Sequence, residues 1–195
     1  QLKSGLGGWW PFNAHARDES GSNNHGTVSG ASLSSDRFGK SQRAYIFDGV
    51  NDFIEIGYPS LISLDFLGQA ITLSTWVQTT SKTFGPLLNK SKGGNTVSGD
   101  YHLTMDSIVS QKAQFAVSRG SGAGLVVNSN AALNNGNWNH VVAVFNSTAG
   151  MGTYLNGTAS TSCFGCTTTP QSMGNSGTPL VFGKSDAHKW FLNGR

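Results

Sequence analysis

The feature that most restricts the fold of this chain is a succession of short apolar–polar runs, each bounded by Gly, Asn, Ser or Asp. In the clearest run, residues 71–78, apolar and polar side chains alternate as they do on a half-buried strand. Residues 140–145 form a more continuous apolar run, which is typical of a strand covered on both faces. Asn156-Gly157 lies between two strand-like runs and indicates a tight hairpin. These patterns predict a chain built from many short strands.

Because the strand-like runs are numerous and show no βαβ rhythm, they predict an all-β fold, a two-sheet antiparallel sandwich. A single helical turn is expected around residues 60–67. No linker, repeat or charge block divides the sequence, so we expect one domain over residues 1–195. The predicted strands cover residues 6–12, 44–48, 53–56, 71–78, 87–90, 101–105, 113–118, 124–127, 139–145, 152–155, 158–162 and 180–183.

The amino-acid composition supports this fold class and limits the classes of partner that the chain can bind. Charged residues make up 12% of the chain and glycine contributes 26 residues, which suits tight turns better than long helices. The net charge of +3 comes from scattered residues, so we expect no nucleic-acid partner. No apolar run reaches the length of a membrane span, and we expect none. The chain begins with Gln1 rather than Met, as expected of a processed piece of a secreted protein.

The cysteines Cys163 and Cys166 form a Cys-Phe-Gly-Cys motif. A redox motif of this spacing belongs at the start of a helix, whereas the Ser- and Thr-rich flanks here favour strand and turn. A zinc site would need two further ligands, and the sequence has no second cysteine pair. We therefore predict a local disulfide between the two, which implies an oxidising compartment and a secreted or cell-surface location.

Several motifs, in this order, resemble the concanavalin A-like lectin/glucanase superfamily, specifically the laminin-G-like modules of bacterial extracellular proteins. The resemblance spans residues 6 to 190, and it implies a jelly roll with a binding function. The motifs are Gly8-Trp-Trp-Pro-Phe-Asn, Asp18-Glu-Ser-Gly-Ser-Asn-Asn-His-Gly-Thr-Val, Ala44-Tyr-Ile-Phe-Asp-Gly-Val-Asn-Asp-Phe-Ile-Glu-Ile, Ile71-Thr-Leu-Ser-Thr-Trp-Val, Trp138-Asn-His-Val-Val-Ala-Val-Phe and Tyr154-Leu-Asn-Gly-Thr.

One departure from the family pattern concerns the last strand. Family members usually carry a final strand after the last turn, at the point where this sequence stops with residues 193–195. We expect the module to be trimmed there, or the strand to come from another polypeptide. Either case would leave an unpaired sheet edge beside the N-terminal strand, open to a partner strand or to an edge-paired dimer, and the chain would otherwise be a monomer.

The carboxylates argue against an enzyme. A typical glycoside hydrolase needs two carboxyl groups flanking one bond, and related glucanases carry an acidic cluster on one strand. Here the only glutamates, Glu19 and Glu55, are far apart in sequence, and Asp52 is three residues from Glu55, on the opposite face of a straight strand. A dyad of Glu55 with Asp48 or Asp52 made by folding stays open. Asp48 and Asp52 flank Gly-Val-Asn, which favours a hairpin turn over a metal site.

The polar loop that begins at Asp18 is the candidate metal site. Calcium takes six to eight oxygen ligands, and a Gly-punctuated polar loop can supply them from side chains and carbonyls. The resemblance also implies a structural Ca²⁺ here, with Asp18 and Asn23 as side-chain ligands and carbonyls near Ser20 and His25 or Gly26. The alternative is an Asx-type turn, in which Asp18 and Asn23 accept hydrogen bonds from backbone N–H groups.

Sugar recognition would need an aromatic platform together with fixed polar groups. Trp76 and Trp138 fall on family core positions and His140 on an apolar strand, so we expect these three to be structural. The candidate ligand-binding residues are the aromatic Tyr101, Phe164 and Trp190, taken to be exposed, and the polar His102, Gln114, Arg119 and Asn128 on one sheet face.

The sequence therefore favours a non-catalytic carbohydrate-binding or adhesion module of a larger secreted or cell-surface protein, with a glycan or polysaccharide as its partner. The alternative is a structural protein–protein module that uses an open sheet edge. A polysaccharide hydrolase or lyase is the third possibility.

Overall fold

The computed structural model describes residues 5–57, 64, 70–91, 99–106, 110–118, 124–160, 163–164, 178–185 and 189–195. Regular structure in these ranges is all strand, and every strand pair is antiparallel. These ranges hold no helix capable of crossing a membrane. The strands are β1 (Gly26–Ser29), β2 (Ser32–Ser34), β3 (Ala44–Asp48), β4 (Phe53–Ile56), β5 (Ala70–Gln78), β6 (Gly85–Ser91), β7 (Gly99–Met105), β8 (Lys112–Val117), β9 (Leu125–Ala132), β10 (Trp138–Asn146), β11 (Gly150–Leu155), β12 (Thr158–Ser160), β13 (Cys163–Phe164), β14 (Leu180–Phe182), β15 (Lys184–Ser185), β16 (Trp190–Phe191) and β17 (Asn193–Gly194).

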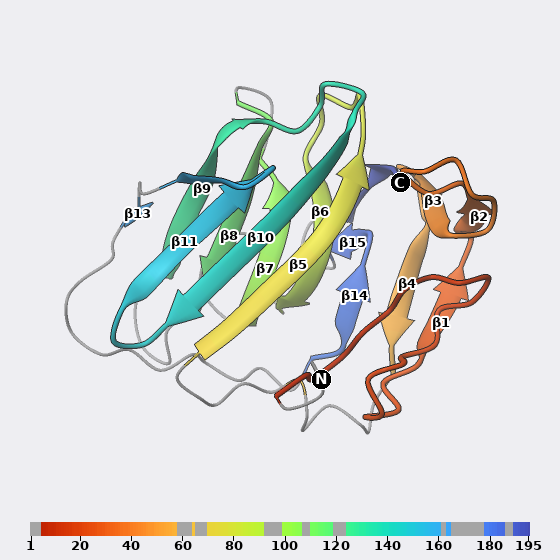
Figure 1. Cartoon of the computed structure of the whole chain (residues 1–195), viewed down its shortest axis with the longest axis horizontal. Helices are drawn as coiled ribbons and strands as arrows, with labels where there is room; N and C mark the ends of the chain where they lie inside the picture. The colour runs from red at the N-terminus through yellow and green to blue at the C-terminus, as the bar shows by residue number, and fades with distance from the viewer. Residues whose placement is uncertain are drawn as a thin grey trace.

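The strands form two layers (Figure 1). The large sheet has the order β1-β4-β14-β6-β7-β8-β9-β13, and the small sheet, in front of it in Figure 1, has the order β12-β11-β10-β5. The strands β17-β3-β2 form a third sheet, and β15-β16 a two-stranded one. This arrangement confirms the predicted antiparallel two-sheet sandwich of the jelly-roll class. The helical turn expected at residues 60–67 lies outside the described residues, except for Leu64.

Local sequence signals explain most of these strands. The predicted strands 44–48 and 53–56 coincide with β3 and β4. The hairpin between β11 and β12 turns on Asn156 and Gly157, whose φ angles are 50° and 83°, and Leu155 pairs with Thr158 across it. A two-residue turn with both φ angles positive is the type I′ turn, for which Asn-Gly is the preferred sequence.

The strand predicted at residues 6–12 is wrong, because these residues form no strand in the structure. Phe12 has a φ of 56°, which interrupts an extended backbone. The ring of Phe12 packs edge-on against Tyr45 at 5.2 Å and Phe182 at 5.9 Å, and Trp10 contacts Phe182 at 5.1 Å. The segment is therefore held by its aromatic side chains and not by a strand ladder.

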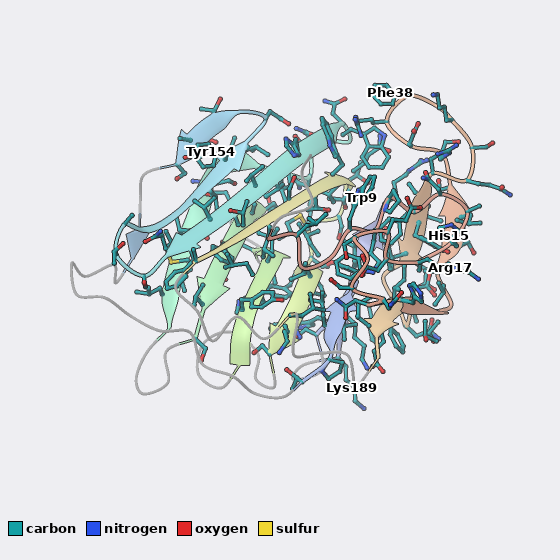
Figure 2. All side chains as sticks on the ribbon, turned by 60° about the horizontal axis from the view of Figure 1, so that its bottom comes forward. Trp9, His15, Arg17, Phe38, Tyr154 and Lys189 are labelled. Atoms are coloured by element: carbon teal, nitrogen blue, oxygen red, sulfur yellow. The ribbon has the colours of Figure 1, made fainter. Side chains whose placement is uncertain are left out.

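This N-terminal segment, residues 5–25, covers part of the large sheet. With about 4.8 Å between strands, the four-stranded sheet is about half as wide as the eight-stranded one and leaves β14, β4 and β1 uncovered. Figure 1 shows the segment crossing in front of these strands. Ala16 packs there in the same core cluster as Ile54, whereas Trp9 stays 52% exposed (Figure 2).

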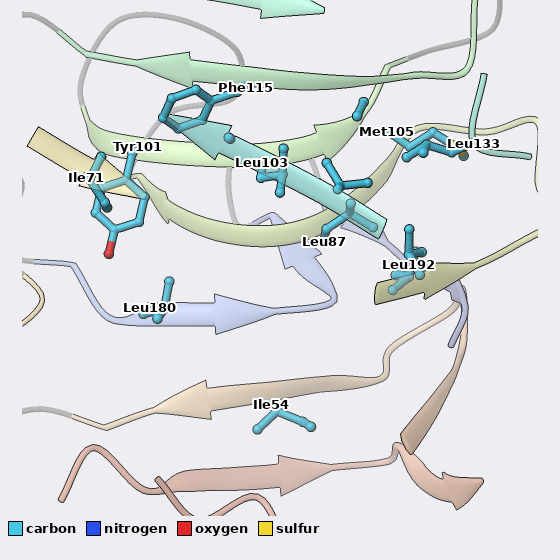
Figure 3. Packing of buried hydrophobic residues seen from close by; sticks show 14 of the residues in the cluster. Ile54, Ile71, Leu87, Tyr101, Leu103, Met105, Phe115, Leu133, Leu180 and Leu192 are labelled. Atoms are coloured by element: carbon cyan, nitrogen blue, oxygen red, sulfur yellow. The ribbon is translucent and has the colours of Figure 1, made fainter. Parts of the chain in front are cut away.

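The core between the two sheets is built from alternate strand positions (Figure 3). Leu103 and Phe115 face each other on β7 and β8, and both are fully buried. Val141 and Ala143 of β10 are equally buried on the side of the small sheet. Burial of an aliphatic or aromatic side chain of this size contributes about 2 kcal/mol, so these alternating positions supply much of the driving force for folding.

Among the described residues, the small sheet is largely unpaired along one edge of β5. One edge of β5 pairs with β10 along its whole length. On the other edge, the described residues provide a partner at Gln78 alone, which exchanges both backbone hydrogen bonds with Arg195, the N–H of Arg195 donating at 2.9 Å. Leu73 and Thr75 face inward but are only half-buried, unlike their partners on β10. Over the described residues, the edge of β5 beside β17 is therefore unpaired beyond Gln78, and β1, the first strand of the chain, is an edge strand of the large sheet.

Two glycines with the same backbone conformation allow the packing of the core to be tested. Gly157 and Gly183 have φ angles of 83° and 84°, but an added Cβ would meet open space at Gly157 and would lie 2.6 Å from a ring carbon of Phe47 at Gly183. Gly157→Ala should reduce the free energy of unfolding by about 1 kcal/mol through backbone strain alone. Gly183→Ala should cost about 2 kcal/mol more through overpacking. Urea unfolding measures both values, and equal losses would contradict the described contact.

Candidate ligand-binding surfaces

The carboxylate of Asp18 is the centre of the N-terminal loop. Its Oδ1 accepts hydrogen bonds from the backbone N–H groups of Trp9 (2.9 Å) and Ser20 (2.8 Å). Its Oδ2 accepts from the Ser20 hydroxyl (2.9 Å) and from the N–H of Asn24 (3.0 Å). Burial alone would raise the pKa of Asp18, but these hydrogen bonds outweigh it and hold that pKa below its ordinary value. The carboxylate is thus already surrounded by donors.

Three of the other residues predicted to supply metal ligands, Asn23, His25 and Gly26, make hydrogen bonds within the loop through other atoms than the predicted ligands. The N–H of Asp18 donates to Nδ1 of His25 at 3.2 Å, and that of Gly26 donates to the carbonyl of Ala16 at 2.7 Å. Asn23 adopts a φ of 59°, and its carbonyl accepts from the N–H of His25. The described residues contain no group of three His, Cys, Asp or Glu side chains placed to hold a metal. For Asp18 the geometry fits the Asx-type alternative, because its two carboxylate oxygens already accept four hydrogen bonds within the loop. The calcium site stays a prediction.

The remaining carboxylates of this half of the chain are also engaged locally. Asp48 accepts from the N–H of Val50 at 2.8 Å, and Asp52 accepts from the N–H of Asp48 at 3.0 Å, so both carboxylates hold the connection between β3 and β4. The predicted hairpin is wrong, because β3 and β4 belong to different sheets and do not pair. Glu55 lies on β4, and its cross-strand partners are Thr27 and Val181. Within the described ranges, the register gives Glu55 no carboxylate partner on a neighbouring strand.

Three of the predicted polar ligand residues do meet on one face of the sandwich, the outer face of the large sheet. Gln114 pairs with Asn128 across β8 and β9, and its amide nitrogen donates to the Asn128 side-chain oxygen at 3.2 Å. Thr104 pairs with Gln114, and His102 lies two residues before it on the same face of β7. The sequence prediction of a shared face is confirmed for His102, Gln114 and Asn128.

This face is not the open groove that the prediction assumed. His102 is 6% exposed and Thr104 2% exposed, while Gln114 and Asn128 are half-buried. Among the described residues, neither Nε2 of His102 nor Oγ1 of Thr104 has a hydrogen-bond partner. Burial lowers the pKa of His102 to about 4, so the imidazole is neutral at pH 7.

The predicted aromatic platforms are placed elsewhere. The exposure expected of Tyr101 is wrong, because the alternation of β7 turns its ring into the core, where its hydroxyl donates to the carbonyl of Leu64 at 3.3 Å. Trp190 on β16 is half-buried and contacts the ring of Phe84 at 4.3 Å. Arg119, Cys166 and the side chains of Cys163 and Phe164 lie outside the described residues, so the disulfide stays a prediction.

The small sheet, the front layer in Figure 1, carries two exposed aromatic residues on its outer face. Trp76 and Tyr154 are each 40% exposed, so the expectation of a structural core role for Trp76 is wrong. His140 pairs with Trp76 and is not a core residue either: the two rings stack at 4.8 Å, and Nε2 of His140 hydrogen-bonds the Ser74 hydroxyl at 2.9 Å. Val142, two residues after His140 on the same face of β10, pairs with Tyr154 on β11 and with Ser74 on β5.

The turn between β2 and β3 reaches this face and carries Arg37. Among the described residues, Arg37 is the only arginine whose guanidinium contacts the ring of Trp76. Cζ of Arg37 lies 4.3 Å from the ring centre of Trp76 and 4.3 Å from that of Phe38, which is 69% exposed. Sequence reasoning missed Arg37, Phe38 and Tyr154. Two sequence signals could have indicated them. Phe38 lies at the tip of a turn that begins at Asp36, and Tyr154 directly precedes the buried Leu155, so the alternation of a strand turns Tyr154 to the exposed face.

Residues 48–195 match the family model Laminin_G_3, described as the concanavalin A-like lectin/glucanases superfamily. The chain belongs to this family. The resemblance inferred from the motifs is thereby confirmed over most of the sequence. None of the curated proteins compared with this Laminin_G_3 chain matches it.

Solved structures similar to this Laminin_G_3 chain include toxin binding domains. The binding domain of Paraclostridial Mosquitocidal Protein 1 aligns with a TM-score of 0.64 and 14% identity over 91% of this chain and 42% of that one. Botulinum neurotoxin type C is described as depending on two ganglioside molecules to enter cells. It aligns with a TM-score of 0.60 and 12% identity over 90% of this chain and 40% of that one. The binding domain of botulinum neurotoxin DC in complex with rat synaptotagmin II aligns with a TM-score of 0.59 and 12% identity over 85% of this chain and 40% of that one. The chain spans about two-fifths of these proteins, and identities this low show the fold alone.

The role of Asp18 can be separated from metal binding. Asp18→Asn places an amide N–H₂ against the N–H donors of the loop and removes the charge, so it should lower the free energy of unfolding by about 3 kcal/mol. The melting temperature of the unmodified protein should be the same in millimolar CaCl₂ and in EDTA. A calcium-dependent rise in melting temperature that Asp18→Asn abolishes would show that Asp18 is a calcium ligand after all.

Proposed function

We propose that the chain is a non-catalytic carbohydrate-binding module of a larger secreted or cell-surface protein. The observation that carries the proposal is the exposed aromatic surface on the outer face of the small sheet. Large aromatic rings are normally buried, and exposed rings grouped on one face mark an interaction site. Here Trp76 and Tyr154 stand on the sheet, and Phe38 stands on the turn beside Trp76.

The chemistry of this face suits a sugar. The C–H face of a pyranose packs on an aromatic ring, while its hydroxyl groups need donors and acceptors at fixed positions. Thr72 and Ser74 alternate with Trp76 on the same face of β5 and are exposed. The family contains lectins, and the toxin domains of the same fold include one described with gangliosides and one in complex with SialylT. These likenesses support a glycan partner and an extracellular location.

The acidic residues support binding over catalysis. Asp18, Asp48 and Asp52 accept hydrogen bonds from the loops that they organise. Glu55 stands between Thr27 and Val181 on the large sheet, on the other layer from the exposed aromatic residues. A two-carboxylate mechanism would need a second acid beside it.

The glycan proposal is tested on an array of neutral and acidic oligosaccharides and polysaccharides. We expect selective binding, with about a tenfold or greater loss of affinity for Tyr154→Ala and Trp76→Ala, since an aromatic–sugar contact contributes more than 1 kcal/mol. Val28→Ala, on the edge strand β1 of the other sheet, is the control and should bind normally. Uniform signals across the array, or aromatic variants that bind as the unmodified protein does, would refute the proposal.

A second function is favoured by the open edge of β5, namely association through an added strand. Because Gln78 directs its N–H and C=O to Arg195, the alternate residues Thr72 and Ser74 direct theirs to the same open edge. A strand that continues in this register would run antiparallel to β5 and place apolar side chains over the half-buried Leu73 and Thr75.

Sedimentation velocity tests strand addition. We expect a concentration-dependent dimer that Thr72→Pro abolishes, because proline removes an edge N–H without removing a hydrogen bond to β10. Thr72→Val, which keeps the N–H, should still dimerise. A protein that stays monomeric at every concentration, or a dimer that is insensitive to proline, would exclude this use of the edge.

A further inference from the structure

The turn that carries Arg37 is closed by hydrogen bonds within itself. Oδ1 of Asp36 accepts from the N–H groups of Phe38 (2.8 Å) and Lys40 (2.9 Å). The backbone closes a second time, because the N–H of Asp36 donates to the carbonyl of Lys40 and the N–H of Gly39 donates to the carbonyl of Asp36, each at 3.0 Å. The carboxylate is therefore used inside the turn, and the side chains of Arg37 and Phe38 project from a fixed backbone. Figure 2 shows Phe38 at the outer end of this loop.

The guanidinium of Arg37 is positioned by aromatic rings. It lies 4.3 Å from the ring centres of both Phe38 and Trp76, and Trp76 is in turn fixed by its stack on His140. Ring contacts engage the flat face of a guanidinium and leave its N–H groups, at the edge of the plane, for other partners. Over the described part of the chain, no hydrogen bond or ion pair engages the side-chain N–H groups of Arg37.

The charges around this point favour an anion. Arg37 and the exposed Lys40 are two cations on one turn, and Asp36 is the single carboxylate there. Burial, with a smaller contribution from Arg37, lowers the pKa of His140, so the imidazole facing Trp76 is neutral at pH 7 and serves as a packing and hydrogen-bonding group. A planar, fixed guanidinium with free donors is the side chain best suited to a carboxylate or a sulfate, which it binds through two parallel hydrogen bonds.

We propose that this site recognises an acidic sugar, with Arg37 binding the carboxylate or sulfate group while the sugar ring packs against Phe38 and the exposed edge of Trp76. This inference rests on the proposed glycan-binding function and names its ligand class. Arg37 is exposed, so its donors are hydrated in the free protein and the gain comes from two charge-assisted hydrogen bonds in a fixed geometry. A neutral sugar of the same shape would form neither of these charge-assisted hydrogen bonds.

The test compares matched ligands that differ only in the acidic group. The probes are a sialylated oligosaccharide and the same oligosaccharide with its sialic acid carboxyl converted to an amide, a uronic-acid polymer and its carboxyl-reduced form, and a sulfated polysaccharide and its desulfated form. The variants are Arg37→Gln, Arg37→Lys and the control Arg17→Gln, which removes the same charge from an exposed arginine of the N-terminal segment (Figure 2). Thermal melting of each variant shows whether its fold is intact.

We expect the acidic member of at least one pair to bind about tenfold or more tightly than its neutral form, and Arg37→Gln to remove that difference. Arg37→Lys should restore it only in part, because lysine keeps the charge but not the planar pair of donors. Arg17→Gln should leave affinity within about twofold, a change too small to reflect a lost charge-assisted hydrogen bond. The pairs also show whether a carboxylate or a sulfate is the ligand.

Each contrary result points to a different failure. Equal binding of the acidic and neutral members, with Arg37→Gln unchanged, would overturn the role of Arg37 and leave the glycan-binding function standing. Equal losses in Arg37→Gln and Arg17→Gln would show general attraction to a basic protein and would also overturn it. Absence of binding to any glycan would refute the proposed function itself.

Discussion

The four hydrogen bonds that Asp18 accepts hold the structure together where its two sheets differ in width. The small sheet covers only part of the large one, and the strands β14, β4 and β1 need another cover. That cover is an irregular segment, which has no ladder of its own and must be fixed by side chains. Asp18 ties its two ends to each other, from Trp9 to Asn24. The aromatic contacts of Trp10 and Phe12 then attach it to Phe182.

This arrangement also explains where the sandwich is open. The N-terminal segment lies over one half of the large sheet and the small sheet over the other, and β5 is the edge between them. Its inward-facing Leu73 and Thr75 remain half-buried, and Arg195 supplies the first pair of a ladder along it. A protein edge of this kind either receives a strand or remains a place where chains associate. The open edge and the aromatic surface share β5, so a strand bound at the edge would border the proposed glycan-binding surface.

The two outer faces of the sandwich differ in what they can do. On the large sheet, the side chains of His102 and Thr104 are buried, and Nε2 of His102 and Oγ1 of Thr104 have no hydrogen-bond partner among the described residues. On the small sheet, the aromatic rings remain accessible and a fixed cation stands beside them. A binding surface needs accessible groups, which is why the proposed site lies on the small sheet.

The sequence by itself determined most of the longer strands, the hairpin at Asn156-Gly157 and the family, because alternation and turn residues act over a few neighbouring positions. It also predicted a strand at residues 6–12 that does not form, and it missed the short strands β1 and β2. It also placed His102, Gln114 and Asn128 on one face, which follows from the period of two. It failed for Tyr101, Trp76 and His140, because alternation separates two faces but does not say which of them another layer will cover. Only the tertiary structure decided that point, and only it brought Arg37 to Trp76, since these residues belong to separate segments and their contact depends on how the two sheets and the turn at Asp36 pack together.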